Sequence, residues 1–180
     1  LNIDIEEPLN NETHFSASSF LNRTIRIDSM VSILYDSPFV FDPNDTVILV
    51  VNVFGYEPEP AGDYYLVGLF RNGTLLNDTI DEYINIYDRD GGINGESIFP
   101  FAFMEDFVAG DTIDMEFRSI NEAYFDFING VKRISRGTDP FGFSGPPANA
   151  VGNIEGGDAL GFFIASAVSR VSTRVRGQNP

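Results

Sequence analysis

The side chains best suited to binding a metal lie in one short glycine-rich stretch, DRDGGINGE. Its oxygen ligands are of the kind that calcium takes, and they come from Asp88, Asp90, Asn94 and Glu96. An EF-hand loop needs Gly at its sixth position and Glu at its twelfth, whereas this stretch has Ile93 sixth and Glu96 ninth. We therefore expect a hairpin turn whose Asp and Asn side chains cap their own backbone, with a calcium site as the alternative.

Nucleophilic catalysis has few candidate residues. The one histidine is His14, and the sequence GFSGP around Ser144 lacks the second glycine of a nucleophile elbow. The chain has no cysteine, so a thiolate nucleophile and a disulfide are both excluded. Its 27 acidic residues offer many carboxylate pairs, and none stands out as a glycosidase pair. We expect no catalytic residues and no enzymatic activity.

Three aromatic residues, Tyr64, Tyr65 and Phe70, could form a platform for a sugar or a peptide. Aromatic side chains along a strand also commonly belong to the core of a sheet. Both interpretations remain open from the sequence.

The net charge of −16 limits the partners of the chain. An acidic surface repels nucleic-acid phosphates and anionic lipid headgroups. We therefore expect no nucleic-acid partner and no direct contact with a membrane surface.

Hydrophobic periodicity predicts strands along most of the chain. Residues 24–36 alternate with a slip near Ser29, and residues 46–57 form an apolar run typical of a central strand covered on both faces. The dipeptide Asn72-Gly73 favours a type I′ hairpin turn. With 43% hydrophobic residues, 180 residues can bury one sizeable core.

One segment has helical periodicity. Ser119 followed by Glu122 resembles a capping box, and the apolar residues after it fall on one helical face. The expected fold is mainly β, an antiparallel β-sandwich of about seven or eight strands with one amphipathic helix near residues 119–135.

A loop rich in glycine and proline precedes the last expected strand, Ala159 to Arg174. It is either a covering loop whose asparagines cap backbone groups or an edge that binds a partner. The candidate partner-binding residues are Pro146, Pro147, Asn149 and Asn153. We expect a polar N-terminal arm over residues 1–23, a single β-sandwich domain over 24–176 and a short tail over 177–180.

Two stretches also carry a family resemblance. The sequences GDTIDMEFRSINEAYFDFINGVKR and PFGFSGPPANAVGNIEGGDALGFFIASAVS resemble the C-terminal half of a family of uncharacterised Bacteroidota outer-membrane lipoproteins, a domain of unknown function. The resemblance covers roughly Ile25 to Arg170. Longer members carry an N-terminal β-domain, so we expect an upstream domain to be missing from this chain.

The resemblance implies a location in the cell envelope, at the outer membrane, held only through a lipid anchor upstream of this chain. Genes of the family commonly lie beside those of TonB-dependent receptors. The resemblance thus implies a non-enzymatic extracytoplasmic accessory or binding domain that assists such a receptor in capturing a nutrient. The alternative is a carbohydrate-binding module or a carboxylate-dependent glycoside hydrolase.

Overall fold

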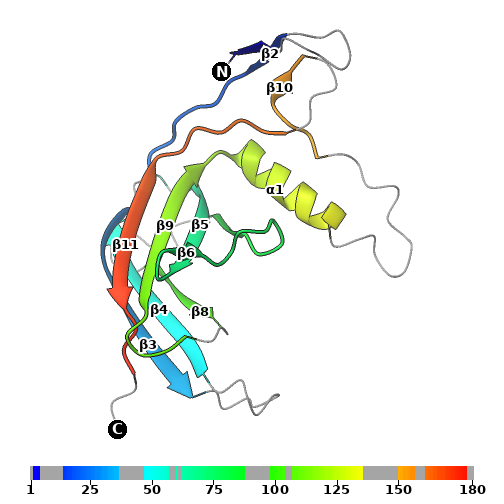
Figure 1. Ribbon diagram of the computed structural model, residues 1–180. Helices are drawn as coiled ribbons and strands as arrows, with labels where there is room; N and C mark the ends of the chain where they lie inside the picture. The colour runs from blue at the N-terminus through cyan, green and yellow to red at the C-terminus, as the bar shows by residue number, and fades with distance from the viewer. Residues whose placement is uncertain are drawn as a thin grey trace.

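The computed structural model describes residues 2–4, 14–36, 47–56, 60, 62–87, 98–103, 107–135, 150–156 and 161–177. Its strands form three antiparallel sheets, and a single helix lies beside them in the described part of the chain (Figure 1). The predicted class, mainly β with antiparallel sheets and one helix, is confirmed. The strands are more numerous than predicted because several are only two or three residues long.

Two sheets form the body of the protein. The first has the order β3-β4-β8 and contains β3 (Arg26–Asp36), β4 (Val47–Tyr56) and β8 (Ile98–Phe103). The second, here called the larger sheet, has the order β11-β9-β5-β6, with β7 also paired to β5. Its strands are β5 (Tyr64–Arg71), β6 (Thr74–Leu75), β7 (Ile84–Tyr87), β9 (Thr112–Ile120) and β11 (Val168–Arg174).

The apolar core lies between these two sheets. Alternate side chains of each strand point inward, and those of both sheets join one buried cluster. The cluster comprises Ile25, Met30, Leu34, Leu49, Val51, Val53, Tyr65, Val67, Leu69, Phe107, Ile113, Met115, Phe117 and Val175. Phe101 of β8 meets Phe117 of β9 edge to face, with ring centroids 6.0 Å apart. The arrangement is sandwich-like.

Strands β3 and β11 hold the two sheets together along one side. The Ser32 hydroxyl of β3 donates a hydrogen bond to the Arg174 carbonyl at 3.1 Å. Just beyond β11, the Leu34 amide donates to the Arg176 carbonyl at 3.2 Å. The sheets therefore share backbone partners on this side in addition to their apolar contacts.

Two local predictions are confirmed. Asn72 and Gly73 have positive φ angles of 50° and 83°, as a type I′ turn between β5 and β6 requires. The slip predicted near Ser29 is a register shift in the pairing of β3 with β4 between Ile27 and Ser29.

The helix α1 (Glu122–Ser135) begins later than predicted. Its N-cap is Asn121, whose Oδ1 accepts a hydrogen bond from the Tyr124 amide at 2.8 Å. The predicted capping box at Ser119 is wrong because Ser119 lies in β9, where it is 1% exposed. Its hydroxyl donates to the Asn22 carbonyl at 2.9 Å and so serves tertiary packing.

The last strand is shorter than predicted. Of the expected strand Ala159 to Arg174, the described residues 161–167 belong to no strand, and β11 starts at Val168. Their backbone pairing is a bridge between Ser166 and Asn22 and a hydrogen bond from the Ser119 amide to the Ala167 carbonyl at 2.9 Å. Side chains take the place of a partner strand here. The Phe163 amide donates to Asn153 Oδ1 at 2.7 Å, and the Ala167 amide donates to the Ser119 hydroxyl at 3.0 Å.

Strand β4 is central in its sheet, as predicted, but only one face is covered. Leu49, Val51 and Val53 are fully buried, whereas Phe54 and Tyr56 are exposed. The prediction of burial on both faces is therefore wrong. A run of β-branched residues also suits a strand with one half-exposed face.

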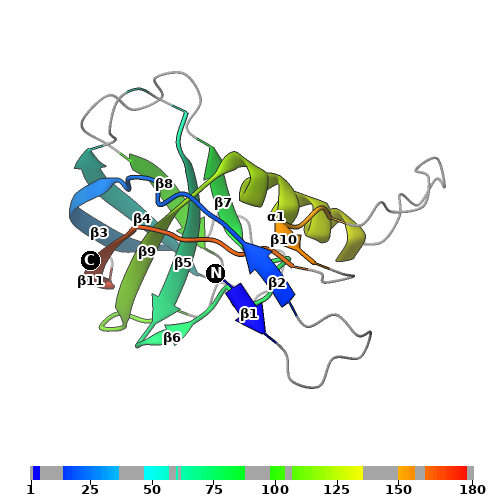
Figure 2. The ribbon, with the colours of Figure 1, turned by 90° about the horizontal axis from the view of Figure 1, so that it is seen from above.

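The helix and a small third sheet lie beyond the ends of β9 and β5 (Figures 1 and 2). The small sheet has the order β1-β2-β10, from β1 (Asn2–Asp4), β2 (His14–Ala17) and β10 (Ile154–Glu155). Polar contacts fix α1 against β7: Asn85 Nδ2 donates to Asn129 Oδ1 at 3.0 Å, and Lys132 Nζ donates to Asn85 Oδ1 at 2.7 Å. The outer face of the larger sheet next to β11 carries the candidate site.

Candidate ligand-binding site

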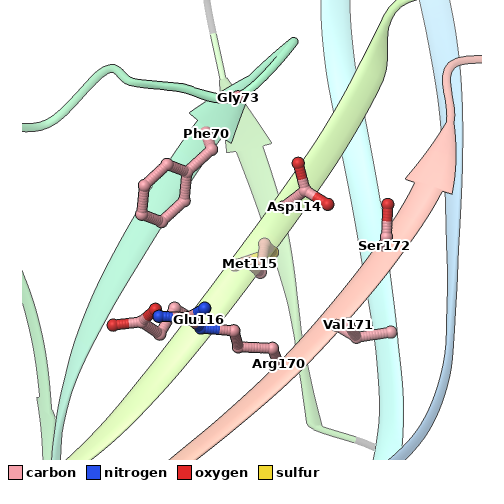
Figure 3. A pocket seen from close by; sticks show the side chains of 8 residues that line it. All are labelled: Phe70, Gly73, Asp114, Met115, Glu116, Arg170, Val171 and Ser172. Atoms are coloured by element: carbon pink, nitrogen blue, oxygen red, sulfur yellow. The ribbon is translucent and has the colours of Figure 1, made fainter.

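A hollow of about 390 Å³ lies on the outer face of the larger sheet. Residues of β5, β9 and β11, and the turn after β5, line it (Figure 3). They are Phe70, Gly73, Asp114, Met115, Glu116, Arg170, Val171 and Ser172. Its volume is within the range of pockets for small molecules, which is roughly 300 to 1,000 Å³.

Strand register brings the polar lining residues together. Asp114 of β9 pairs with Phe70 of β5 and with Ser172 of β11. In the neighbouring row, Glu116 pairs with Gly68 on one side and with Arg170 on the other. Because alternate residues share a face, both rows belong to the same surface of the sheet.

Glu116 is the unusual residue of this surface. It is 2% exposed, although it lies on the outer face of the sheet. Its Oε1 accepts a hydrogen bond from Arg118 Nε. Its Oε2 lies 2.5 Å from Arg170 Nε as an ion pair, yet receives no hydrogen bond from the described residues. A buried carboxylate at the wall of the hollow therefore has one oxygen that is held by an ion pair without a hydrogen bond from the described residues.

The two arginines that contact Glu116 differ in how far their side chains are exposed to solvent. The side chain of Arg118 is 45% exposed and that of Arg170 is 73% exposed. The guanidinium group of Arg170 reaches across to the Glu116 carboxylate (Figure 3). Because most of the Arg170 side chain is in solvent, it can change its rotamer without unpacking the sheet. The Glu116 carboxylate is buried, so a departing Arg170 must be replaced there by another donor.

Gly68 leaves space beside this carboxylate. A Cβ atom at Gly68 would lie 3.2 Å from a ring carbon of Phe70 and 3.7 Å from the Cβ of Glu116. The glycine therefore lets the Phe70 ring lie close to the sheet, next to the buried carboxylate.

The predicted aromatic residues do not form one platform. Tyr65 is 2% exposed in the core, on the opposite face of β5 from Tyr64 and Phe70. Tyr64 stacks on Tyr87 with ring centroids 4.5 Å apart, at the helix end of the sheet. Phe70 alone lines the hollow.

Tyr64 contacts both a neighbouring strand and the helix. Burial, followed by a hydrogen bond to the Glu122 carboxylate, raises the pKa of its hydroxyl to about 12. The ring also lies 5.0 Å from that of Phe125 of α1. These contacts indicate that Tyr64 joins the helix to the sheet.

The predicted partner loop is described only at Asn153. Its Nδ2 donates to the carbonyls of Ser18 at 2.9 Å and Phe163 at 2.8 Å. This residue thus caps backbone groups, as one of the two interpretations expected. The other three, Pro146, Pro147 and Asn149, lie outside the described residues.

The predicted calcium ligands Asp88, Asp90, Asn94 and Glu96 also lie outside the described residues, so the calcium site stays a prediction. In the part of the chain that the structure describes, no group of three or more His, Cys, Asp or Glu residues could hold a metal ion.

The lining residues Asp114, Glu116, Arg170 and Ser172 were not predicted as a site. The pattern of β9 predicts only a strand with one wet face, which includes Asp114 and Glu116. Their meeting with β11 depends on a strand register that pairs Glu116 with Arg170 and Asp114 with Ser172, residues 54 and 58 positions apart in the sequence. The pairing of the charged Glu116 with Gly68 marks the position, but this pairing is visible only once the register of β5 and β9 is known.

The structure defines a mainly β domain with a ligand-sized hollow on one sheet. The chain belongs to the family described as domain of unknown function DUF4249, which it matches over residues 2–172. No curated protein and no solved structure matches the chain. Among the described residues, no helix is long and apolar enough to cross a membrane.

Proposed function

We propose that this chain is a non-enzymatic, extracytoplasmic binding domain of an outer-membrane lipoprotein, which assists a TonB-dependent receptor in capturing a nutrient. The observation that carries the binding role is the hollow on the larger sheet, where an aromatic ring and several charged side chains meet in one recess. An apolar surface with a few converging polar groups is typical of small-molecule sites.

The geometry favours binding over glycoside hydrolysis. A glycosidase places two carboxyl groups on either side of the bond that it cleaves, and one of them must donate a proton. Glu116 already contacts two guanidinium groups, so it is engaged as an ion-pair partner.

The envelope location and the receptor partner rest on the resemblance over Ile25 to Arg170 to lipoproteins of the Bacteroidota outer membrane. The charge of −16 agrees with a body that stands off an anionic lipid surface and is attached through an upstream anchor. Such a body has the outer face of its larger sheet, next to β11, available for solute contacts.

Affinity purification of the full-length protein from outer membranes tests the partnership. We expect it to recover the TonB-dependent receptor encoded beside it, and an unrelated lipoprotein purified in the same way should not. The Arg170→Gln variant should recover the receptor equally well, because Arg170 lies in the hollow. Repeated recovery of the intact protein without the receptor would contradict the proposal.

A further inference from the structure

The hollow offers a ligand both acceptors and donors of hydrogen bonds. The carboxylates of Asp114 and Glu116 accept, the guanidinium of Arg170 donates, and the Ser172 hydroxyl does both. The ring of Phe70 adds an apolar wall. A complementary ligand must therefore both donate and accept, and must have an apolar surface.

The Oε2 atom of Glu116 restricts which ligands can bind in the hollow. Its Oε2 is buried, receives no hydrogen bond from the part of the chain that the structure describes, and forms an ion pair with the exposed side chain of Arg170. The ion pair compensates the charge but does not meet hydrogen-bond geometry, so a well-aligned donor from a ligand can replace Arg170 at this oxygen. The ligand should thus bring at least one hydroxyl or amide N–H to Oε2.

Charge disfavours two classes of ligand, anions and cations. An anion would approach two carboxylates, Asp114 and Glu116, on a chain of net charge −16. A cation would have to replace the Arg170 guanidinium at Glu116 and leave that arginine beside a second positive charge. Neutral hydroxyl groups avoid both costs because each one can donate to a carboxylate and accept from a guanidinium.

We propose that the hollow binds a neutral polyhydroxylated solute, namely a saccharide ring. The apolar face of the ring lies against Phe70, and its hydroxyls donate to Asp114 and to Glu116 Oε2. Arg170 moves away from Oε2 and donates to a ligand oxygen. The proposal deepens the proposed function by naming the solute class, and it depends on that function only for the binding role of the hollow.

Calorimetric titration of the whole chain with a panel of neutral mono- and oligosaccharides tests the ligand class. Two charged solutes of similar size, a uronic acid and an amino sugar, serve as comparisons. We expect saturable binding of at least one neutral saccharide, with affinity at least tenfold above that for its charged analogues. Absence of binding across the neutral panel, or preference for a charged analogue, would overturn the proposal.

Variants of β11 locate the site. Arg170→Gln removes the donor, and Arg174→Gln is the matched control because Arg174 lies on the same strand and face but outside the lining of the hollow. We expect Arg170→Gln to weaken saccharide binding at least tenfold, and Arg174→Gln to leave it unchanged. Equal affinity for the two variants would overturn the assignment to the hollow. It would leave the receptor partnership untouched, because co-purification measures that separately.

Discussion

Asn72 and Asp111 join two turns that lie 39 positions apart in the chain. Asn72 Nδ2 donates to Asp111 Oδ1 at 2.8 Å, and Asn72 Oδ1 accepts from the Thr112 amide at 2.9 Å. Asp111 Oδ2 accepts from the Val108 amide at 3.0 Å and pairs with Arg71 Nε at 2.8 Å. These contacts fix the turn after β5 against the start of β9, next to the hollow.

This network makes the stability of the fold depend on pH. The Val108 amide, and then the Asn72 side chain, hold the pKa of the Asp111 carboxyl below its usual value. The stability that this carboxylate contributes is fully present above its unfolded pKa of about 3.9 and is lost as pH falls through its lower folded pKa. At neutral pH, we expect Asp111→Asn to lower the free energy of unfolding by about 1 to 3 kcal/mol.

Urea unfolding from pH 7 to pH 2.5 measures the size of this stability loss and the direction in which it changes with pH. The difference between the wild type and Asp111→Asn should shrink as the pH falls below about 4. Asp78→Asn, at an exposed position, is the control and should follow the wild type throughout. A difference that stays constant across this range would contradict the assigned role of the Asp111 carboxylate.

Asn77 completes the edge of β5. This strand pairs with β7 over its first half and with β6 at its end, and the Asn77 side chain fills the gap between them. Its Nδ2 donates to the Val67 carbonyl at 2.7 Å, and its Oδ1 accepts from the Leu69 amide at 2.8 Å. We expect Asn77→Ala to destabilise the fold by about 2 to 4 kcal/mol, because two buried backbone groups lose their partners.

Thermal and urea unfolding measure this loss. Asn77→Asp should be no better than Asn77→Ala, because a carboxylate oxygen would face the Val67 carbonyl. Asp78→Ala, one position along and exposed, should change stability by less than about 0.5 kcal/mol. An unchanged melting temperature for Asn77→Ala would contradict the stabilising role assigned to its two hydrogen bonds.

The start of α1 gives a third prediction. Because the Asn121 side chain caps the helix, Asn121→Ala should destabilise the protein by about 1 kcal/mol. Asn121→Asp should retain most of the stability, since aspartate caps equally well. Chemical denaturation of the two variants measures these differences. Equal losses of stability in Asn121→Ala and Asn121→Asp would contradict the capping role.

Local features of this fold were predictable from the sequence, because their causes lie within a few residues. The Asn72-Gly73 turn depends on the tolerance of these two residues for positive φ, and the alternation along β9 reports its buried face directly. The helix was located correctly, but its first turn was not. Ser119 and Asn121 are both good capping residues, and only the tertiary contacts of Ser119 decide between them.

The site was not predictable in the same way. Glu116 has the pattern of a solvent-facing residue, and its burial arises from arginines on its own strand and on β11.

The end of the predicted last strand was right, but its beginning was not. Asn153 and Ser119 supply the hydrogen bonds that a neighbouring strand would otherwise provide. Both features depend on pairing between distant segments, which periodicity does not encode.

The most direct test of the saccharide site uses a single tryptophan, because the chain contains none. Val168→Trp places it on an exposed position of β11, two residues from Arg170, and Val151→Trp places it on a distant exposed position as the control. We predict that titration with the neutral saccharide panel gives a saturable change in emission for Val168→Trp and none for Val151→Trp. A saccharide that binds by calorimetry but leaves the Val168→Trp emission unchanged, or that changes both reporters alike, would contradict binding in the hollow.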